Sequence, residues 1–347
     1  MVKVLVNGYG TIGKRVAWAL RRQSDLTLYG VVKRRPDYSA ILAVKSGIDV
    51  YVPGEEELRA FEESGVRVAG LLDDALGRVD AVVDATPGGV GRKYKGLYVK
   101  HGVKAVFQGG EAPDVAQVSF NPLCNYSEAL GKDFIRVVSC NTTALLRLIC
   151  SLNRYFTVDR VRAVIVRRGA DPKEVRRGPI NAIVLNPPKL PSHHGVDVKT
   201  VLPWLDIQTA AFAVPTTLMH THFIQVFLKE GVTREDVVRV LEGSPRIVLV
   251  GAEALGVSST AELAEVIRDM GRARGDMYEL AVWEESVTVI DGREVMLTQS
   301  VHQESIVVPE NVDALRAALS IEKDGERSIN ITDTALGLVG GWLLWSS

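Results

Sequence analysis

The sequence predicts an α/β fold that begins with a doubly wound parallel sheet and continues into an α+β domain with a mostly antiparallel sheet. The first 140 residues alternate short apolar runs with helical patterns, the order that a parallel sheet with crossover helices requires. After about residue 150 the chain instead carries two apolar segments around Asp291-Gly292, the pattern of a β-hairpin. A length of 347 residues suits two domains. We expect one domain over 1–139, completed by 303–347, and a second over 140–302.

The elements of the first domain follow from short, nearly continuous apolar runs, which suit strands buried on both faces of a sheet. The predicted strands are Val2–Val6, Leu26–Val32, Ala81–Asp84, Lys104–Phe107 and Ile135–Val138. Helical periodicity predicts helices over Thr11–Arg22 and around Ala40–Val44.

In the second domain, Val158–Arg167 is predicted as a strand, and the hairpin joins Val287–Ile290 to Glu294–Thr298. Capping patterns begin two helices, with Thr233 before Asp236 and Ser259 before Glu262. The predicted helices cover Thr233–Leu241, Ser259–Met270, Pro309–Leu319 and Thr332–Leu344. The segment 169–203 is rich in Pro, Gly, Asn and His, and is too long for an ordinary connection, which indicates a functional or disordered loop.

Composition excludes several classes of protein. The 41 basic and 42 acidic residues leave a net charge of -1, which argues against a nucleic-acid partner. Three Cys form no disulfide framework, and no Cys/His spacing resembles a zinc site, so no metal is expected. No apolar run reaches the ~20 residues of a membrane span, and Val2–Val6 lacks the features of a signal peptide. We therefore expect a cytoplasmic protein without a membrane partner.

A glycine loop follows the first predicted strand and opens the first helix, with Gly8, Gly10 and Gly13 in the spacing GxGxxG. Gly8 permits the tight turn, Gly10 lets the backbone approach a pyrophosphate, and Gly13 allows close helix–strand packing. The amides at Thr11 and Ile12 begin the helix, where unpaired N–H groups favour an anion. The loop predicts a dinucleotide site in a Rossmann domain; the alternative is a structural turn without a cofactor.

The end of the second predicted strand indicates which dinucleotide binds. A site that prefers NAD usually carries an acidic residue there for the ribose 2′-hydroxyl, whereas this chain reads Lys33-Arg34-Arg35. Cations at this position attract a 2′-phosphate, so NADP is predicted as the preferred cofactor over NAD. The alternative is a solvated basic turn, partly neutralised by Asp37.

Cys140 lies between the apolar run Ile135–Val138 and the helical run Ala144–Ile149, at the predicted start of a helix. Unpaired N–H groups at a helix start lower the pKa of a thiol, and a thiolate attacks carbonyl carbons. The alternative is a small buried apolar residue. Cys124 and Cys150 flank Cys140, and we hypothesise a disulfide between them, with two reduced thiols as the alternative.

Several segments extend this pattern over nearly the whole chain. The chain resembles the archaeal-type glyceraldehyde-3-phosphate dehydrogenases in its opening Val-Asn-Gly-Tyr-Gly-Thr-Ile-Gly-Lys-Arg and in Ser139-Cys140-Asn141-Thr142-Thr143. The resemblance continues through Arg35–Tyr38, Ala85–Pro87, Phe107–Glu111, Asn186–Pro188, His193–Gly195 and Pro215–His222. In the bacterial and eukaryotic branch the nucleophile segment reads Ser-Cys-Thr-Thr-Asn, so roles from that branch do not transfer by spacing.

The resemblance implies a phosphorylating oxidation of D-glyceraldehyde 3-phosphate, with NAD(P) and inorganic phosphate, to 1,3-bisphosphoglycerate in glycolysis or gluconeogenesis. Cys140 would form a thiohemiacetal with the aldehyde and then a thioester that phosphate cleaves. His220 would be the base. For His222 the residues themselves leave the alternative of a hydrogen-bonded structural residue. The resemblance also implies a homotetramer.

The resemblance assigns further residues around Cys140. Gly110, Arg168 and Gln303 would contact the cofactor. The substrate would contact Ser139, Asn141, His194 and Gly195. Arg167-Arg168 would supply bidentate contacts for the phosphate groups of the two reactants.

Two other functions stay open at this point. Another Cys-dependent acyl-phosphate dehydrogenase, such as aspartate-semialdehyde or N-acetyl-glutamyl-phosphate dehydrogenase, also pairs a Rossmann domain with a nucleophilic Cys. A regulatory protein that senses the dinucleotide is the alternative from a different class.

Overall fold

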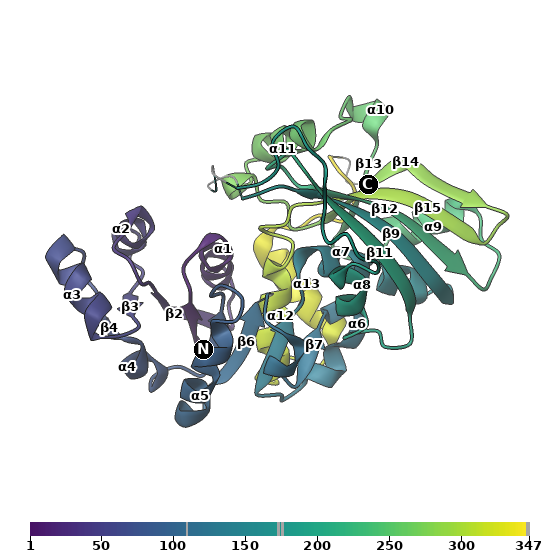
Figure 1. The fold of residues 1–347 in the computed structure, drawn as a ribbon. Coiled ribbons are helices and arrows are strands. Elements are labelled where there is room, and N and C mark those ends of the chain that lie inside the picture. Colours follow the sequence, from purple (N-terminus) through teal and green to yellow (C-terminus); the bar gives the residue numbers. More distant parts are fainter. Residues whose placement is uncertain (109, 172–173, 175–176, 345–347) are drawn as a thin grey trace. The chain divides into compact units, whose positions relative to one another are not determined.

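The computed structural model describes residues 1–108, 110–171, 174 and 177–344. The chain divides into two compact units (Figure 1): a first unit of 1–139 with 308–336, and a second unit of 140–307 with 337–347. The division after residue 139 lies where the sequence places it. The expectation that all of 303–347 completes the first domain is wrong at both ends, because 303–307 and 337–347 belong to the second unit.

The first unit contains an all-parallel sheet of eight strands in the order β4-β3-β2-β1-β5-β6-β8-β7. Chain order reverses on either side of β1, which is the doubly wound arrangement that the sequence predicts. The strands are β1 (Val2–Asn7), β2 (Leu26–Val32), β3 (Val50–Val52), β4 (Gly70–Leu71), β5 (Ala81–Asp84), β6 (Lys104–Gln108), β7 (Val118–Phe120) and β8 (Phe134–Val137).

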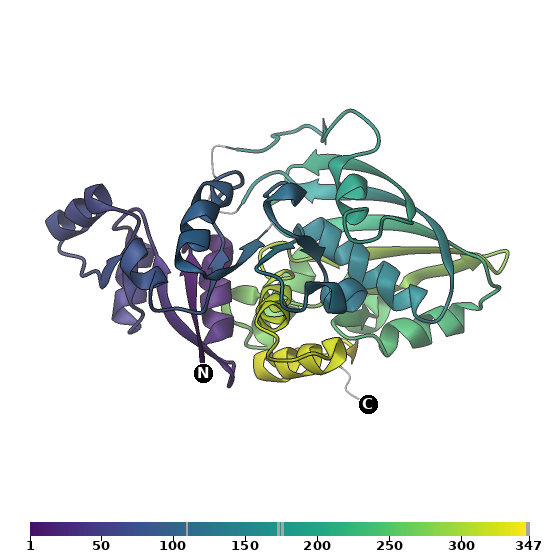
Figure 2. The ribbon, with the colours of Figure 1, turned by 90° about the horizontal axis from the view of Figure 1, so that it is seen from below.

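Helices connect these strands, and a late segment of the chain adds two more. They are α1 (Thr11–Leu20), α2 (Tyr38–Lys45), α3 (Glu55–Ser64), α4 (Leu72–Leu76), α5 (Gly91–His101), α6 (Pro122–Asn125), α12 (Val308–Ala318) and α13 (Gly325–Leu336), with short 3-10 turns at Pro113–Val115 and Tyr126–Ala129. In Figure 2, α12 and α13 lie side by side. The buried guanidinium of Arg316 on α12 donates to both carboxylate oxygens of Asp25 and to Gln23, which ties this return segment to the first unit.

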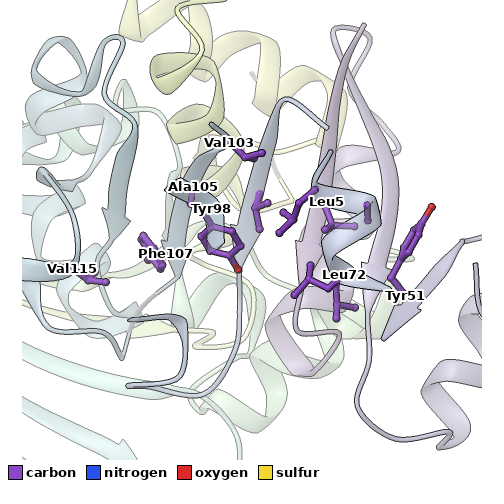
Figure 3. Packing of buried hydrophobic residues seen from close by; sticks show 12 residues of the cluster. Leu5, Tyr51, Leu72, Tyr98, Val103, Ala105, Phe107 and Val115 are labelled. Carbon is purple, nitrogen blue, oxygen red and sulfur yellow. The ribbon is translucent and has the colours of Figure 1, made fainter. Parts of the chain in front are cut away.

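Apolar residues from the strands form the core of the first unit, as Figure 3 shows for Leu5, Ala105 and Phe107. Tyr98 on α5 packs against Phe107, with ring centroids 6.2 Å apart. Both residues are fully buried. Strands with apolar side chains on both faces, covered by helices, explain the continuous apolar runs of the sequence.

The second unit contains another eight-stranded sheet in the order β10-β11-β9-β12-β15-β14-β13-β16. Four of its seven neighbouring pairs are antiparallel, which confirms the mostly antiparallel prediction. The strands are β9 (Val158–Arg168), β10 (Val184–Leu185), β11 (Asp206–Val214), β12 (His220–Leu228), β13 (Ile247–Val250), β14 (Leu280–Ile290), β15 (Glu294–Val301) and β16 (Gly341–Trp342).

The predicted hairpin is β14–β15, and its turn residues Asp291 and Gly292 both have positive φ. The helices are α7 (Cys140–Asn153), α8 (His193–Val198), α9 (Arg234–Glu242), α10 (Ala252–Leu255) and α11 (Thr260–Asp269), with a 3-10 turn at Ala273–Gly275. Thr233 and Asp236 form the predicted capping box of α9, and the Ser259 side chain caps α11. Helices α7 and α8 contact each other, and they contact β9, β15 and β11 of the sheet (Figure 1).

Two predictions about the second half need correction. The described part of 169–203 is not a plain loop, since it contains β10 and α8. The predicted helix Thr332–Leu344 is wrong over most of its length, because α13 ends at Leu336 and β16 follows. Gly337 and Gly341 both have positive φ, a backbone state that ends a helix. No helix among the described residues is long and apolar enough to cross a membrane.

Candidate active site

The glycine loop joins β1 to α1 as predicted, and its glycines have different steric surroundings. Gly8 has φ of +95°, and a Cβ there would lie 2.8 Å from the backbone of Ala85. A Cβ on Gly13 would lie 1.8 Å from the carbonyl oxygen of Gly8. The tight turn and the close helix–strand packing are therefore both requirements of the folded chain.

Gly10 differs, because a Cβ there would meet nothing within 4 Å among the described residues. It is the N-cap of α1 and precedes Thr11 and Ile12, whose N–H groups begin the helix, in a first turn without acidic residues. The fold itself does not need a glycine here, but a dinucleotide pyrophosphate close to the backbone would. The loop therefore fits the predicted cofactor.

A buried polar cluster next to this loop was not anticipated from the sequence. The hydroxyl of Tyr98 donates to Asp84 at 2.6 Å and accepts from Asn7 at 2.7 Å. The second carboxylate oxygen of Asp84 accepts from the backbone and hydroxyl of Thr86. These contacts hold the segment after β5 against the glycine loop. Polar residues at the carboxyl ends of the apolar runs containing Asn7 and Asp84 are the signal that could have revealed it.

Substitutions at Gly10 and Gly13 should separate binding from folding. Gly10→Ala is expected to weaken dinucleotide binding at least about ten-fold while leaving thermal stability near wild type, because only the ligand side is obstructed. Gly13→Ala, the matched control, is expected to destabilise the protein by about 1–3 kcal/mol through overpacking. Cofactor titration and thermal denaturation of both variants test this. Unimpaired binding by Gly10→Ala would contradict the position of the pyrophosphate.

The predicted cations follow β2, where Lys33, Arg34 and Arg35 line a surface recess. Both predicted cofactor contacts already have acidic partners: Lys33 with Asp37 at 2.7 Å, and Arg34 with Glu57 at 3.2 Å. Burial raises the pKa of Asp37, but hydrogen bonds from Lys33 and Ser39 outweigh it and hold the pKa at about 2. A 2′-phosphate would compete with these carboxylates for the two cations.

Cys140 is the first residue of α7, as predicted, and it is a free cysteine. The predicted lowering of its pKa is wrong in direction. Burial raises the pKa of the thiol, while the guanidinium groups of Arg167 and Arg168 and the backbone amides of Asn141 and Cys140 act to lower it. The helix start does supply hydrogen bonds to the thiolate, but the cost of desolvating the sulfur exceeds them.

His220, the predicted base, begins β12 and is 3 % exposed. The backbone N–H of Arg168 donates to its Nδ1 at 3.0 Å. Burial lowers the pKa of His220 well below its ordinary value, and Arg167, His222 and Arg168 lower it further. The ring is therefore neutral, and because Nδ1 accepts a hydrogen bond, the proton resides on Nε2.

Arg168 and Gln303, both predicted cofactor contacts, lie together in the second unit. The guanidinium of Arg168 pairs with Glu304 at 2.9 Å and with Asp171. With its amide oxygen turned toward Arg168, Gln303 accepts from the same guanidinium. Two carboxylates and an amide thus occupy the donors of Arg168, which leaves it less suited to a substrate phosphate than Arg167.

Arg167 has more capacity for an anion. One of its terminal nitrogens donates to Asn186, whereas its buried Nε has no hydrogen-bond partner among the described residues. The ring of the exposed His193 packs against that of His194, with centroids 3.9 Å apart and an angle of 34° between the ring planes. Burial is the largest cause that lowers the pKa of His193, and the charge of Arg167 lowers it further. Arg167 and His193 therefore lie in one positively charged region of the second unit.

The predicted substrate contacts Asn141, His194 and Gly195 are buried and already bonded to protein. The Asn141 side chain bonds to His222 and His194, His194 also bonds to Ser192, and the Gly195 N–H donates to Thr209. Ser139 is half-buried at the end of the first unit. Gly110 has φ of +71° and lies close to Gly88. Cys124 and Cys150 are disulfide-bonded, as hypothesised from the sequence, whereas Cys140 is free.

Comparisons with known proteins agree with these features. Residues 139–286 match the family model of the glyceraldehyde 3-phosphate dehydrogenase C-terminal domain, and residues 2–110 match that of the dihydrodipicolinate reductase N-terminus. A glyceraldehyde-3-phosphate dehydrogenase of Hyperthermus butylicus is 58% identical over 340 residues, which cover 98% of both chains. One from Metallosphaera sedula is 56% identical over 99% of this chain and 100% of its own. The chain belongs to the glyceraldehyde-3-phosphate dehydrogenase family.

Membership in the glyceraldehyde-3-phosphate dehydrogenase family confirms the resemblance drawn from the sequence motifs and identifies the chain as an oxidoreductase. A third relative, from Aeropyrum pernix, is 58% identical over 97% of this chain and 98% of its own. The C-terminal family model covers Cys140, His220 and Arg167, so the candidate chemistry lies inside the matched region.

Proposed function

We propose that the protein catalyses the phosphorylating oxidation of D-glyceraldehyde 3-phosphate to 1,3-bisphosphoglycerate, in glycolysis or gluconeogenesis. The observation that carries this proposal is the free thiol of Cys140 at the start of α7. The charge of Arg167 acts on this thiol and on the buried, neutral ring of His220, and Nε of Arg167 has no hydrogen-bond partner among the described residues. Full-length relatives named for this aldehyde support the choice of substrate.

In the first step, the sulfur of Cys140 forms a bond to the aldehyde carbon, and the carbonyl electron pair moves onto the oxygen. The backbone amides of Asn141 and Cys140, together with Arg167 and Arg168, favour the thiolate form that attacks. Desolvation of the half-buried Cys140 raises the thiol pKa, and these groups act against that rise. The neighbouring charges and amides therefore offset part of the rise in the thiol pKa, and the helix start alone does not activate the nucleophile.

His220 acts on the oxygen of the thiohemiacetal. Its Nδ1 accepts from the Arg168 backbone, so the nitrogen left for the substrate is Nε2, which carries a proton in the neutral ring. His220 thus enters the reaction as a hydrogen-bond donor that stabilises an alkoxide, instead of the base that the sequence predicts. The alkoxide can expel a hydride without a separate base.

When bound, a nicotinamide dinucleotide would supply the acceptor for that hydride, and loss of the hydride would leave the alkoxide carbon as a thioester of Cys140. Phosphate oxygen then attacks the thioester carbon, the carbon–sulfur bond breaks, and the thiolate is regenerated. We assign the phosphate groups to Arg167 and His193, since Nε of Arg167 has no hydrogen-bond partner in the part of the chain that the structure describes, and His193 is exposed. His194 has both ring nitrogens occupied and would support the site instead of contacting substrate.

The residues that would hold the cofactor are Gly10 and the amides of Thr11 and Ile12, because the space around the Gly10 Cα is open, among the described residues, on the side where a pyrophosphate would bind. Gly8 and Gly13 maintain the loop. Gly110, Arg168 and Gln303 remain proposed contacts on the resemblance of their segments to the family.

A requirement for inorganic phosphate tests the proposed reaction. With D-glyceraldehyde 3-phosphate and NADP⁺ or NAD⁺, reduced cofactor should form only when phosphate is added. The absorbance of the reduced cofactor at 340 nm measures this. Arsenate, which forms an unstable acyl ester, should replace phosphate and drive the reaction further. Turnover that is independent of either anion would contradict a phosphorylating dehydrogenase, and turnover of aspartate semialdehyde instead would support the rival enzyme.

We propose NADP as the preferred cofactor, held at its 2′-phosphate by Lys33 and Arg34. Replacing both by Ala is expected to raise the KM for NADP⁺ about ten-fold or more and to leave the KM for NAD⁺ within about two-fold, because only NADP carries that phosphate. Lys45→Ala, an exposed cation at the end of α2, is the control. Equal changes for both cofactors would show that these cations do not read the 2′ position.

We also propose a cytoplasmic homotetramer, as the family resemblance implies. Exposed apolar side chains in the second unit, at Ile180, Ile183, Leu185 and Leu190, support a subunit interface on the segment that precedes α8.

A further inference from the structure

A continuous chain of buried polar side chains in the second unit passes through Asn141, the residue after Cys140. In order, the chain is Gln299 on β15, His222 on β12, Asn141 on α7, His194 on α8, Ser192 and Thr209. Successive polar atoms lie 3.1, 2.8, 3.2, 3.1 and 2.7 Å apart. Each of the six residues is at most 2 % exposed.

The hydrogen bonds of this chain run in a single sense. The amide of Gln299 donates to Nδ1 of His222, so Nε2 of His222 carries the proton and donates to the side-chain oxygen of Asn141. The amide nitrogen of Asn141 then donates to Nε2 of His194, whose Nδ1–H donates to Ser192. Thr209 closes the chain by accepting from the Gly195 backbone and donating to the Ser192 carbonyl.

Strand register explains how distant residues meet here. His222 lies directly opposite Gln299 in the antiparallel pair of β12 and β15. His220, two residues earlier, is buried on the same face of β12, so one strand supplies both the proposed alkoxide donor and a member of the chain. A second tie lies next to Asn141, where the Thr142 hydroxyl donates to Asp197 at 2.8 Å.

The consequence for Cys140 comes through the backbone. The Asn141 N–H is one of the groups that favour the thiolate, and its position depends on how the first turn of α7 is held. The Asn141 carboxamide has a partner on each side, and loss of either partner would leave a buried polar atom without its hydrogen bond, which is unfavourable. The two histidines therefore restrict the rotation of Asn141 and the start of α7.

We propose that Gln299 and His222 are positioning residues for the nucleophile: through the Asn141 side chain they hold the first turn of α7, which begins at Cys140, without touching substrate themselves. This inference rests on the proposed role of Cys140. Burial keeps the rings of His222 and His194 neutral, with the pKa of His222 at about 3 and that of His194 at about 2. The donor and acceptor roles along this series of hydrogen bonds therefore persist at neutral pH.

The test compares two replacements of His222. In His222→Gln the side chain keeps an N–H that can reach Asn141, whereas His222→Leu removes it. We expect His222→Leu to slow alkylation of Cys140 by iodoacetamide at pH 7 about ten-fold, and to lower kcat similarly with little change in KM. His222→Gln should recover most of both. Mass spectrometry locates the alkylated thiol, and thermal denaturation shows whether each variant is folded.

Gln299→Leu is a second variant at the far end of the chain, and it should change alkylation and kcat in the same direction by a smaller factor. Gln225→Leu, on β12 but bonded to Glu294, is the matched control and should change neither. Wild-type alkylation and kcat in folded His222→Leu would overturn the proposal, as would equal losses in His222→Leu and His222→Gln. Alkylation needs no substrate, so it judges this inference even if the proposed reaction fails its phosphate test.

Discussion

Cys140→Ala is expected to abolish turnover of D-glyceraldehyde 3-phosphate, with kcat at least about 10³-fold below wild type, because no other step can capture the aldehyde as a thioester. Cofactor affinity and thermal stability should stay near wild type, since the residue is small and its substitution removes only the sulfur. Steady-state assays at saturating phosphate, with cofactor titration on the same samples, measure both quantities.

Cys140→Ser refines this experiment. A hydroxyl at this position is far less acidic than a thiol. The Ser variant should therefore be nearly as inactive as the Ala variant, although serine is similar in size to cysteine. Iodoacetamide should inactivate the wild type in parallel with the loss of one free thiol, and the cofactor should still bind afterwards. Turnover by either variant within ten-fold of wild type would refute Cys140 as the nucleophile.

His220 variants are expected to show the second largest effect, and they distinguish a donor from a base. His220→Leu should lower kcat by about 10²–10³-fold, the range for loss of one donor to an oxyanion. His220→Gln keeps an N–H and should retain substantially more activity than the Leu variant. If His220 were the base, Gln could not accept the proton and both variants would be equally impaired.

The pH dependence provides an independent check on His220. Its pKa lies well below the ordinary value because the ring is buried near two arginines. The neutral ring should therefore persist as the pH falls through 6.5, and the wild-type kcat should show no acid limb from an imidazole near that pH. An acid limb near pH 6.5 that disappears in His220→Gln would contradict the neutral donor.

Local features were the most predictable from the sequence. The strand Leu26–Val32, the capping box at Thr233 and the turn at Asp291-Gly292 each depend on a few consecutive residues, and each is found as expected. The helix Thr332–Leu344 was predicted wrongly because its apolar residues outweighed the glycines at 337, 340 and 341. Those glycines end α13 and allow the chain to return as β16 beside β13.

The sequence by itself determined the parallel sheet, the glycine loop and the place of Cys140 at the start of a helix, since these follow from apolar runs and neighbouring residues. Only the tertiary structure decided the state of the functional groups. The tautomer of His220 depends on an amide 52 residues away, and the occupied donors of Arg168 on a carboxylate 136 residues away. The pKa of Cys140 likewise depends on how deeply the folded chain buries the sulfur. Hydrogen-bond direction and desolvation are set by which groups the fold brings together, and no local pattern encodes them.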